Sequence, residues 1–257
     1  MTGRRPFLAA NWKMHLLRAD AAVYCRVLRS DLAGKSPEEG PRVVIFPSFP
    51  LLPVVAEELR GSSVALGGQD LHPEDKGAHT GDVSGAQLAD AGCAWVLCGH
   101  SERRRDHGES DEWVGRKAAA ASRNGLSPLV CIGETRQERQ SGATFAVLER
   151  QLRAGLAAVL EGGAGDGGRY AVAYEPVWAI GTGETATPEI AQAAHRFLRG
   201  LLSELTPDAA VVSLLYGGSV TADNAASLSA QPDIDGFLVG GASLDPQKFL
   251  AIIRASG

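Results

Sequence analysis

A glutamate beyond the middle of the chain lies between an apolar run and an apolar loop. Val172 to Tyr174 are apolar, Glu175 follows them, and Pro176 fixes its own φ and keeps Glu175 out of helical geometry. The loop from Val177 to Ile180 is apolar, and Gly181 gives its far end backbone freedom. An apolar loop over a carboxylate would exclude water and raise the pKa of that carboxylate, which suits a general base. From this stretch alone, a strand followed by a turn with an incidental glutamate is an equal alternative.

Polar residues that could assist such a base follow two earlier apolar runs. Asn11 and Lys13 come after the first run, and His100 and Glu102 come after a later one. A lysine can neutralise phosphate or developing oxyanion charge. His100 is expected at the start of a short helix that begins near Ser101, and a helix N-terminus disfavours the imidazolium, so the ring is predicted to be neutral. Taken singly, His100 would be a turn residue and Lys13 a surface lysine.

Two glycine pairs follow the last two apolar runs of the chain. Gly217-Gly218 leads into Ser219, and Gly240-Gly241 follows the final run. Glycine turns that enter helices can direct backbone N–H groups at an anion. Either pair alone would be a tight turn, but two pairs on neighbouring strands indicate a phosphate site.

Eight apolar runs alternate with segments of helical periodicity along the chain. Strands are predicted at residues 6–10, 42–46, 64–69, 94–98, 127–131, 170–174, 211–215 and 236–239. Helices are predicted at 20–32, 51–59, 87–91, 111–124, 144–160, 188–205, 223–229 and 246–255. Such alternation implies parallel pairing, and eight strands close into a barrel.

The chain is therefore predicted to be α/β, a single (β/α)8 barrel domain over residues 1–257, which is the usual size for that fold. An open doubly wound sheet is the alternative, but it needs a topological switch and usually a nucleotide fingerprint. In a barrel the site lies at the C-terminal ends of the strands, where all the polar residues and glycine pairs named above fall.

Motifs for cofactors and metals are not convincing. Residues 181–186 match the dinucleotide fingerprint G-x-G-x-x-[GA], but Glu175 to Ile180 separate them from the strand and no ribose-binding acid follows. The six histidines do not fall at metal-ligand spacing, and His72, His79 and His107 are predicted to be loop residues rather than ligands. No cofactor and no metal are expected.

Composition excludes several classes of partner and compartment. A net charge of −5 argues against a nucleic-acid or membrane surface, so an anionic substrate must be held by local positive features. No apolar run approaches membrane-spanning length, and the run after Pro6 is too short for a signal peptide. No C-x-x-C pair occurs, so free thiols in a reducing cytoplasm are expected at the four cysteines, Cys25, Cys93, Cys98 and Cys131.

Five motifs, in order and from the first strand to the last helix, resemble the triosephosphate isomerase family. They lie at residues 11–13 (NWK), 98–103 (CGHSER), 173–183 (AYEPVWAIGTG), 216–219 (YGGS) and 236–243 (GFLVGGAS). The resemblance implies a cofactor-free enzyme of glycolysis and gluconeogenesis. Such an enzyme interconverts dihydroxyacetone phosphate and D-glyceraldehyde 3-phosphate through an enediolate.

The same resemblance implies a role for each site residue. Glu175 would be the base, His100 the electrophile that polarises the carbonyl, and Lys13 the cation that neutralises charge. Glu102 would be a supporting acid that braces Lys13 or the subunit contact. The substrate would be bound by Asn11, Lys13, Gly181, Ser219, Gly240 and Gly241.

The polar loop from Asp70 to Ser84 is longer than most connections, and such loops are usually functional or disordered. In the family the matching loop inserts into a second subunit beside the residues of the first strand, which implies a homodimer. His79 stands where Phe or Tyr is common, Asp82 where Glu is usual, and Asp70 where Asn is common. These departures weaken an expected ion pair between Asp82 and Arg103 across the interface, and they bear on dimer strength rather than on catalysis.

Two other functions are compatible with the fold. One is an isomerase of a related sugar phosphate, such as a tetrulose phosphate, but the unbroken tip Ala179-Ile180-Gly181 favours the small triose. The other is a non-catalytic barrel scaffold, which would have no need of Asn11, Lys13, His100 and Glu175 together.

Overall fold

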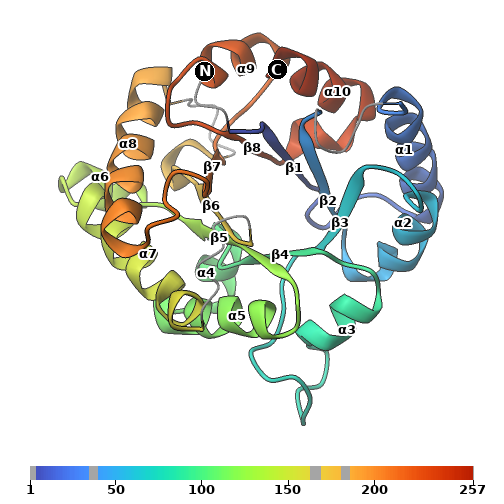
Figure 1. The fold of residues 1–257 in the computed structure, drawn as a ribbon, viewed down its shortest axis with the longest axis horizontal. Coiled ribbons are helices and arrows are strands. Elements are labelled where there is room, and N and C mark those ends of the chain that lie inside the picture. The colour runs from blue at the N-terminus through green and yellow to red at the C-terminus, as the bar shows by residue number, and fades with distance from the viewer. Residues whose placement is uncertain (1–3, 35–39, 163–168, 181–185, 257) are drawn as a thin grey trace.

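A closed barrel of eight parallel strands forms the centre of the computed structural model, which describes residues 4–34, 40–162, 169–180 and 186–256 (Figure 1). Each strand pairs with the next in the sequence, and the last pairs with the first. The strands are β1 (Phe7–Asn11), β2 (Arg42–Phe46), β3 (Val64–Gly68), β4 (Trp95–Cys98), β5 (Ser127–Ile132), β6 (Ala171–Tyr174), β7 (Ser213–Tyr216) and β8 (Gly236–Val239).

Helices form a ring around the barrel and cover the outer face of the strands (Figure 1). The α-helices are α1 (Arg18–Asp31), α2 (Leu52–Glu58), α3 (Gly85–Asp90), α4 (Ser101–His107), α5 (Asp111–Arg123), α6 (Arg136–Gln140), α7 (Thr144–Glu161), α8 (Pro188–Leu205), α9 (Ala222–Ser229) and α10 (Pro246–Ala255). Short 3-10 helices are η1 (Phe49–Leu51), η2 (Val177–Ala179) and η3 (Gly241–Leu244).

The predicted (β/α)8 barrel is confirmed, and the differences are local. β7 was expected to begin at Val211, but it begins at Ser213, because Val211 lies in a turn with 57% of its surface exposed. α3 begins earlier than expected because Ser84 caps it, with its hydroxyl accepting a hydrogen bond from the Gln87 N–H. The short helix α6 was not predicted, since its five residues present no apolar stripe.

Side chains alternate between two apolar layers along each strand. Phe7 and Ala9 of β1 lie in the barrel interior, whereas Leu8 and Ala10 pack outward against the helices. Ala171 and Ala173 of β6 also lie in the interior. Continuing the alternation by one step directs Asn11 and Glu175 into the mouth of the barrel. Leu215 of β7 and Leu238 of β8 also lie in the interior. Two residues further along, Gly217 and Gly240 therefore lie at the mouth.

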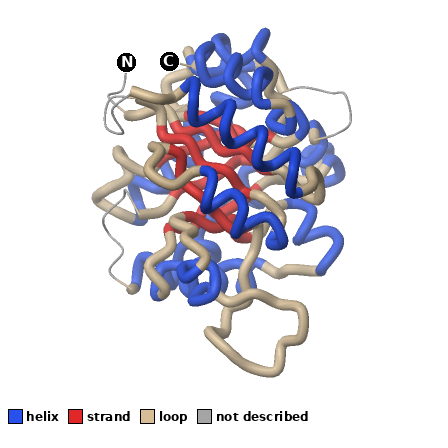
Figure 2. Tube along the Cα trace, turned by 90° about the vertical axis from the view of Figure 1, so that its right-hand side faces the viewer, coloured by secondary structure: helices blue, strands red, loops and turns tan. Residues whose placement is uncertain are grey.

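The segment between β3 and α3 stands away from the barrel, at the lower edge of both overall views (Figures 1 and 2). Its neck is closed where the His72 N–H donates to the Val83 carbonyl at 2.8 Å. Within the described ranges, no helix combines the length and the apolar character that crossing a bilayer requires.

His195 of α8 is fully buried against the outer face of the barrel beside Tyr174 and Tyr216. Its Nδ1 lies 3.1 Å from the Asp233 carbonyl oxygen, so Nδ1 carries the ring proton and donates it. Burial lowers the pKa of His195 from 6.5 to about 4, because the imidazolium would be desolvated.

This buried ring should make folding sensitive to mild acid. Below pH 6.5 the unfolded chain protonates His195 while the native chain does not, so the free energy of unfolding falls as pH drops toward 4. The loss attributable to this residue should reach about 3 kcal/mol. Urea unfolding of wild type and His195→Gln between pH 7 and 4 measures the difference, and parallel pH profiles would contradict this assignment.

Candidate active site

The corner after β6 is fixed by its neighbours on both sides. The Glu175 N–H donates to the Ile132 carbonyl at 2.7 Å, and the Gly217 N–H donates to the Tyr174 carbonyl at 2.7 Å. A Cβ at Gly133 would lie 1.7 Å from the Glu175 carbonyl oxygen, and one at Gly217 would lie 2.9 Å from the Glu175 Cγ. Glycine is therefore required beside the corner, directly after β5 and directly after β7, where it leaves room for Glu175 at the mouth of the barrel.

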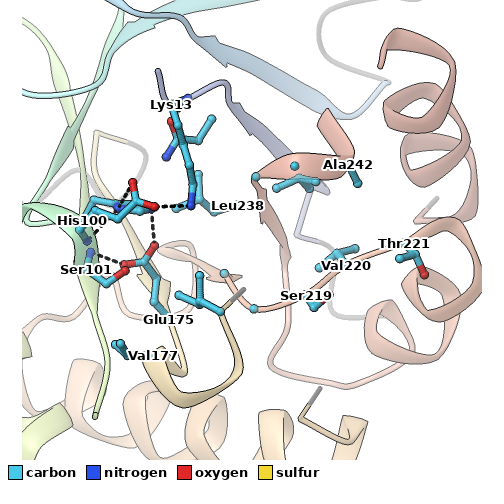
Figure 3. Close-up of a pocket in the computed structure, with 18 of the residues that line it drawn as sticks. Lys13, His100, Ser101, Glu175, Val177, Ser219, Val220, Thr221, Leu238 and Ala242 are labelled. Carbon is cyan, nitrogen blue, oxygen red and sulfur yellow. Dashed lines mark hydrogen bonds and ion pairs between the residues drawn. The ribbon is translucent and has the colours of Figure 1, made fainter. Parts of the chain in front are cut away.

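The Glu175 carboxylate is buried against the start of α4 (Figure 3). Its Oε1 lies 2.9 Å from His100 Nε2, and its Oε2 accepts a hydrogen bond from the Ser101 N–H at 2.8 Å. Each carboxylate oxygen thus has a donor from the segment where β4 turns into a helix.

The pKa of Glu175 is lower than that of an ordinary glutamate. Burial alone raises this pKa, but the charge and hydrogen bond of His100, the Ser101 N–H and the charge of Lys13 together outweigh burial. The predicted upward shift is therefore wrong for this position of the carboxylate, because the expectation counted water exclusion and not the donors.

His100 is the N-cap residue of α4 and is nearly fully buried. Its Nδ1 accepts a hydrogen bond from the Glu102 N–H at 3.2 Å, which leaves Nε2 to carry the proton and donate to Glu175. The predicted position at a helix start is confirmed. Burial lowers the pKa of His100, but the charge and hydrogen bond of Glu175 raise this pKa by more than burial lowers it. The net shift is therefore upward. This upward shift acts against the predicted neutral ring, whereas the hydrogen bond that Nδ1 accepts requires it.

Lys13 follows β1 in an unusual backbone conformation, with φ of 52°. The Lys13 N–H donates to Asn11 Oδ1 at 3.0 Å, and the Lys13 carbonyl accepts from Gln69 Nε2 at 2.8 Å. Its Nζ lies 2.6 Å from Glu102 Oε1. These contacts hold the lysine over the mouth of the barrel, and the contact with Glu102 is the one that the predicted bracing role would need.

One hollow of about 530 Å³ gathers the predicted site residues. Figure 3 shows Lys13, His100 and Glu175 on one side of it, facing Ser219 and Ala242 across the opening. A Cβ at Gly240 would lie 3.4 Å from the Lys13 Cε, so the lysine passes close to the turn after β8. The predicted residues that line it are Asn11, Lys13, His100, Glu102, Glu175, Ser219, Gly240 and Gly241. Gly181 lies outside the described residues.

Comparison with known proteins agrees with this geometry. The family model of triosephosphate isomerase matches residues 6–256. The chain belongs to the triosephosphate isomerase family. It is 49% identical over 252 residues to the triosephosphate isomerase of Moorella thermoacetica, covering 98% of each chain. It is 50% identical over 256 residues to that of Thiobacillus denitrificans, covering 98% of this chain and 99% of the relative. The predicted family resemblance is confirmed.

In this member of the triosephosphate isomerase family, a buried acid anchors the start of the apolar loop. This residue was not identified from the sequence. Glu134 Oε1 accepts hydrogen bonds from Trp178 Nε1 at 2.8 Å and from the Tyr174 hydroxyl at 3.2 Å. Arg139 pairs with Glu134 at 3.3 Å and lies over the Trp178 ring at 4.3 Å. A glutamate two residues after the apolar run of β5 was the available signal, because an acid there must find buried partners.

Arg104 of α4 was also missed, and it holds the helix that carries His100. Its guanidinium donates to the Gly99 carbonyl at 2.9 Å, to the Cys131 carbonyl at 3.2 Å and to Asp111 Oδ1 at 2.6 Å. One side chain thereby connects α4 with the residue after β4, with β5 and with α5. No local pattern marks such a residue, since its partners come from three separate segments.

Removing the charge of Glu175 should lower the pKa of His100. In Glu175→Gln the coulombic interaction that raises this pKa is lost, whereas burial, which lowers it, remains. A pH titration of the ring nitrogen chemical shifts of His100 by NMR measures the change, with the distant His195 ring as internal reference. An unchanged or higher pKa in the variant would show that charge coupling to Glu175 does not govern the ring.

Proposed function

We propose that Glu175, His100 and Lys13 carry out the reaction of this chain. The activity is that of a triosephosphate isomerase, an aldose–ketose isomerase. The observation that carries the assignment of residues is the convergence of these three side chains on one wall of a hollow whose opposite wall contains two glycine turns.

Glu175 is the base that moves the proton. Interconversion of dihydroxyacetone phosphate and D-glyceraldehyde 3-phosphate removes a proton from the carbon next to the carbonyl and returns one to the neighbouring carbon. The lowered pKa of Glu175 keeps its carboxylate ionised at neutral pH, ready to accept that proton. To reach the substrate carbon, the carboxylate must leave its two donors, His100 Nε2 and the Ser101 N–H.

His100 and Lys13 stabilise the enediolate. Once Glu175 turns to the substrate, the Nε2–H of His100 can donate to the carbonyl oxygen on which negative charge develops. The charge that raised the pKa of His100 has then moved away, so burial and the hydrogen bond from the Glu102 N–H favour a neutral donor. Lys13 adds positive charge in the same hollow.

The glycine turns after β7 and β8 hold the phosphate. Ser219, Gly240 and Gly241 line the hollow opposite the base, and phosphate sites in such barrels recur at these two turns. Gly181 is assigned to the same anion from the resemblance. The apolar Val177 and Ile180 line the hollow beside Glu175, where they would exclude water from the enediolate.

The assignment of the base is tested by Glu175→Gln. Loss of general base catalysis should lower kcat by about 10²–10⁴-fold in an assay coupled to D-glyceraldehyde 3-phosphate, with the affinity for inorganic phosphate little changed. Glu112→Gln, the same change at an exposed glutamate of α5, is the matched control and should leave kcat unaltered. Near-normal turnover of Glu175→Gln would remove Glu175 from the mechanism.

We also propose that the chain forms a homodimer through the loop from Asp70 to Ser84. Beside the site, Met14 and Leu17 have 92% and 75% of their surface exposed, and such apolar exposure favours a protein contact. Arg103 pairs with Asp70 at 2.9 Å and with Glu109 at 2.8 Å in its own chain. Those pairs reduce what Arg103 can offer across an interface, so apolar contact would supply most of the affinity.

Sedimentation equilibrium tests the dimer. Met14→Glu should shift the chain toward monomer and reduce its isomerase activity at low protein concentration, because a charge would be buried at the contact. Val23→Glu, at an apolar residue of α1 with 58% of its surface exposed, should leave the assembly unchanged. A wild-type chain that sediments only as a fully active monomer would refute the proposal.

Finally, we propose that the enzyme works in the cytoplasm. All four cysteines are free and buried. Burial raises the pKa of Cys25 and of Cys93 to about 12, so their thiols stay protonated and unreactive. Unpaired structural thiols of this kind suit a reducing compartment.

A further inference from the structure

We propose that His72, His79 and Asp82 bind one divalent transition-metal ion on the loop between β3 and α3. The sequence predicted the two histidines as plain loop residues, because their spacing matches no metal motif. Folding of the loop brings them together with the aspartate. The inference is independent of the proposed catalytic residues, since none of these three side chains lines the hollow at the barrel mouth.

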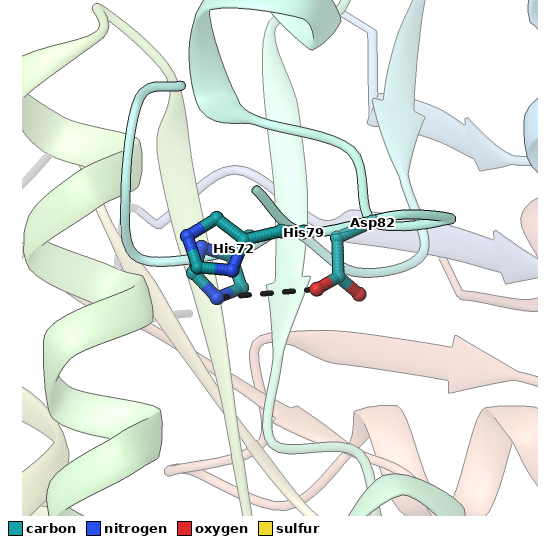
Figure 4. Close-up of side chains that lie close together, drawn as sticks. All are labelled: His72, His79 and Asp82. Carbon is teal, nitrogen blue, oxygen red and sulfur yellow. Dashed lines mark ion pairs between the residues drawn. The ribbon is translucent and has the colours of Figure 1, made fainter. Parts of the chain in front are cut away.

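The three side chains present ligand atoms to one point (Figure 4). One ring nitrogen from each histidine and one carboxylate oxygen of Asp82 all lie within 4.8 Å of one another. His72 Nε2 and Asp82 Oδ2 are 3.9 Å apart, and the two imidazole rings are stacked with centroids 3.8 Å apart. The side chains of His79 and Asp82 are exposed in the single chain, so small rotations of these two are enough to bring such atoms to bonding distance from one ion.

The backbone of the loop holds these residues in place. His72 forms a bridge with Ser84 at the neck, and the Asp82 N–H donates to the His79 carbonyl at 3.0 Å in a tight turn. A Cβ at Gly77 would lie 3.0 Å from the His79 ring, so a glycine there leaves space for the imidazole. The ligands are therefore positioned by the fold of the loop, which lowers the entropy lost on binding.

His72 is the least exposed of the three ligands, and a hydrogen bond to its ring must be broken when the ion binds. Its side chain is 10% exposed, and its ring packs edge-on against Trp113 with centroids 5.5 Å apart. Its Nδ1 accepts a hydrogen bond from the Glu74 N–H at 3.0 Å. Coordination through Nε2 displaces the Nε2 proton and requires the neutral ring to carry its proton on Nδ1, so the bond from Glu74 is given up.

The ligand set selects the class of ion. Two imidazoles and one carboxylate suit Zn²⁺, Co²⁺ or Ni²⁺ rather than Mg²⁺ or Ca²⁺, which prefer oxygen ligands alone. Two nearby acids, Glu74 and Asp75, form ion pairs with Arg116 and Arg123. Asp82 is the acid that faces the rings, and water would complete the coordination of the ion.

A bound ion would join the neck of the loop to its tip. His72 lies at the neck beside Ser84, whereas His79 and Asp82 lie in the turn farther out. Cross-linking these two parts stiffens the segment, because an ion that binds only the folded loop stabilises that fold. The loop should then resist local opening more strongly in the presence of the ion.

Co²⁺ binding to the full, untagged chain tests the site. Titration should give one Co²⁺ per chain, with a visible absorption band that Zn²⁺ abolishes by competition. His72→Asn, His79→Phe and Asp82→Asn should each weaken Co²⁺ binding at least tenfold. His107→Asn, which removes an exposed histidine outside the cluster, should bind Co²⁺ as wild type does.

Thermal unfolding of each variant, followed by circular dichroism, reports whether the barrel is intact, because the loop also belongs to the proposed dimer contact and activity would respond to loss of the dimer. Hydrogen exchange of residues 72–84 in wild type, with and without Zn²⁺, supplies a readout that needs no variant, and slower exchange with Zn²⁺ is expected. The proposal is overturned if wild type binds no Co²⁺, if His79→Phe binds it as tightly as wild type, or if exchange in the loop is unchanged by Zn²⁺.

Discussion

The buried carboxylate of Glu175 is the constraint on which the rest of the site depends. A buried charge is tolerated only where donors compensate it, and here both donors, His100 Nε2 and the Ser101 N–H, come from the start of α4. β6 and α4 must therefore keep their separation to within a fraction of an ångström. This need explains the close approach at Gly133 and Gly217 and the three hydrogen bonds by which Arg104 attaches α4 to its neighbours.

The same contacts make the strength of the base depend on its position. Against α4 the donors outweigh burial, and the pKa of Glu175 is lowered. In the reaction we propose, the carboxylate leaves these donors but stays in a hollow lined by Val177 and Ile180, where burial continues to raise its pKa. Glu175 is thus held ionised at rest, and in the proposed reaction leaving these donors would make it a stronger base.

Much of the fold and the site could be predicted from the sequence, because it depends on periodic and local features. Eight apolar runs specify the barrel, and counting along β1 and β6 directs Asn11 and Glu175 to one mouth. The partners of Glu134 and Arg104 could not be predicted, since they come from separate strands and helices. The pKa directions were missed for a related reason. Each is a balance of burial against specific donors, and the donors are known only once the chain is folded.

The projecting loop is attached to the catalytic helix by buried charge. Asp70, at the base of the loop, pairs with Arg103 of α4 and with Lys117 of α5, whose side chain is 2% exposed. Glu109 pairs with the same two cations. The two carboxylates and the two cations make this cluster neutral. Removing any one of the four side chains would leave an unpaired charge in the interior. The ion pairs therefore tie the base of the loop to the helix that begins after His100.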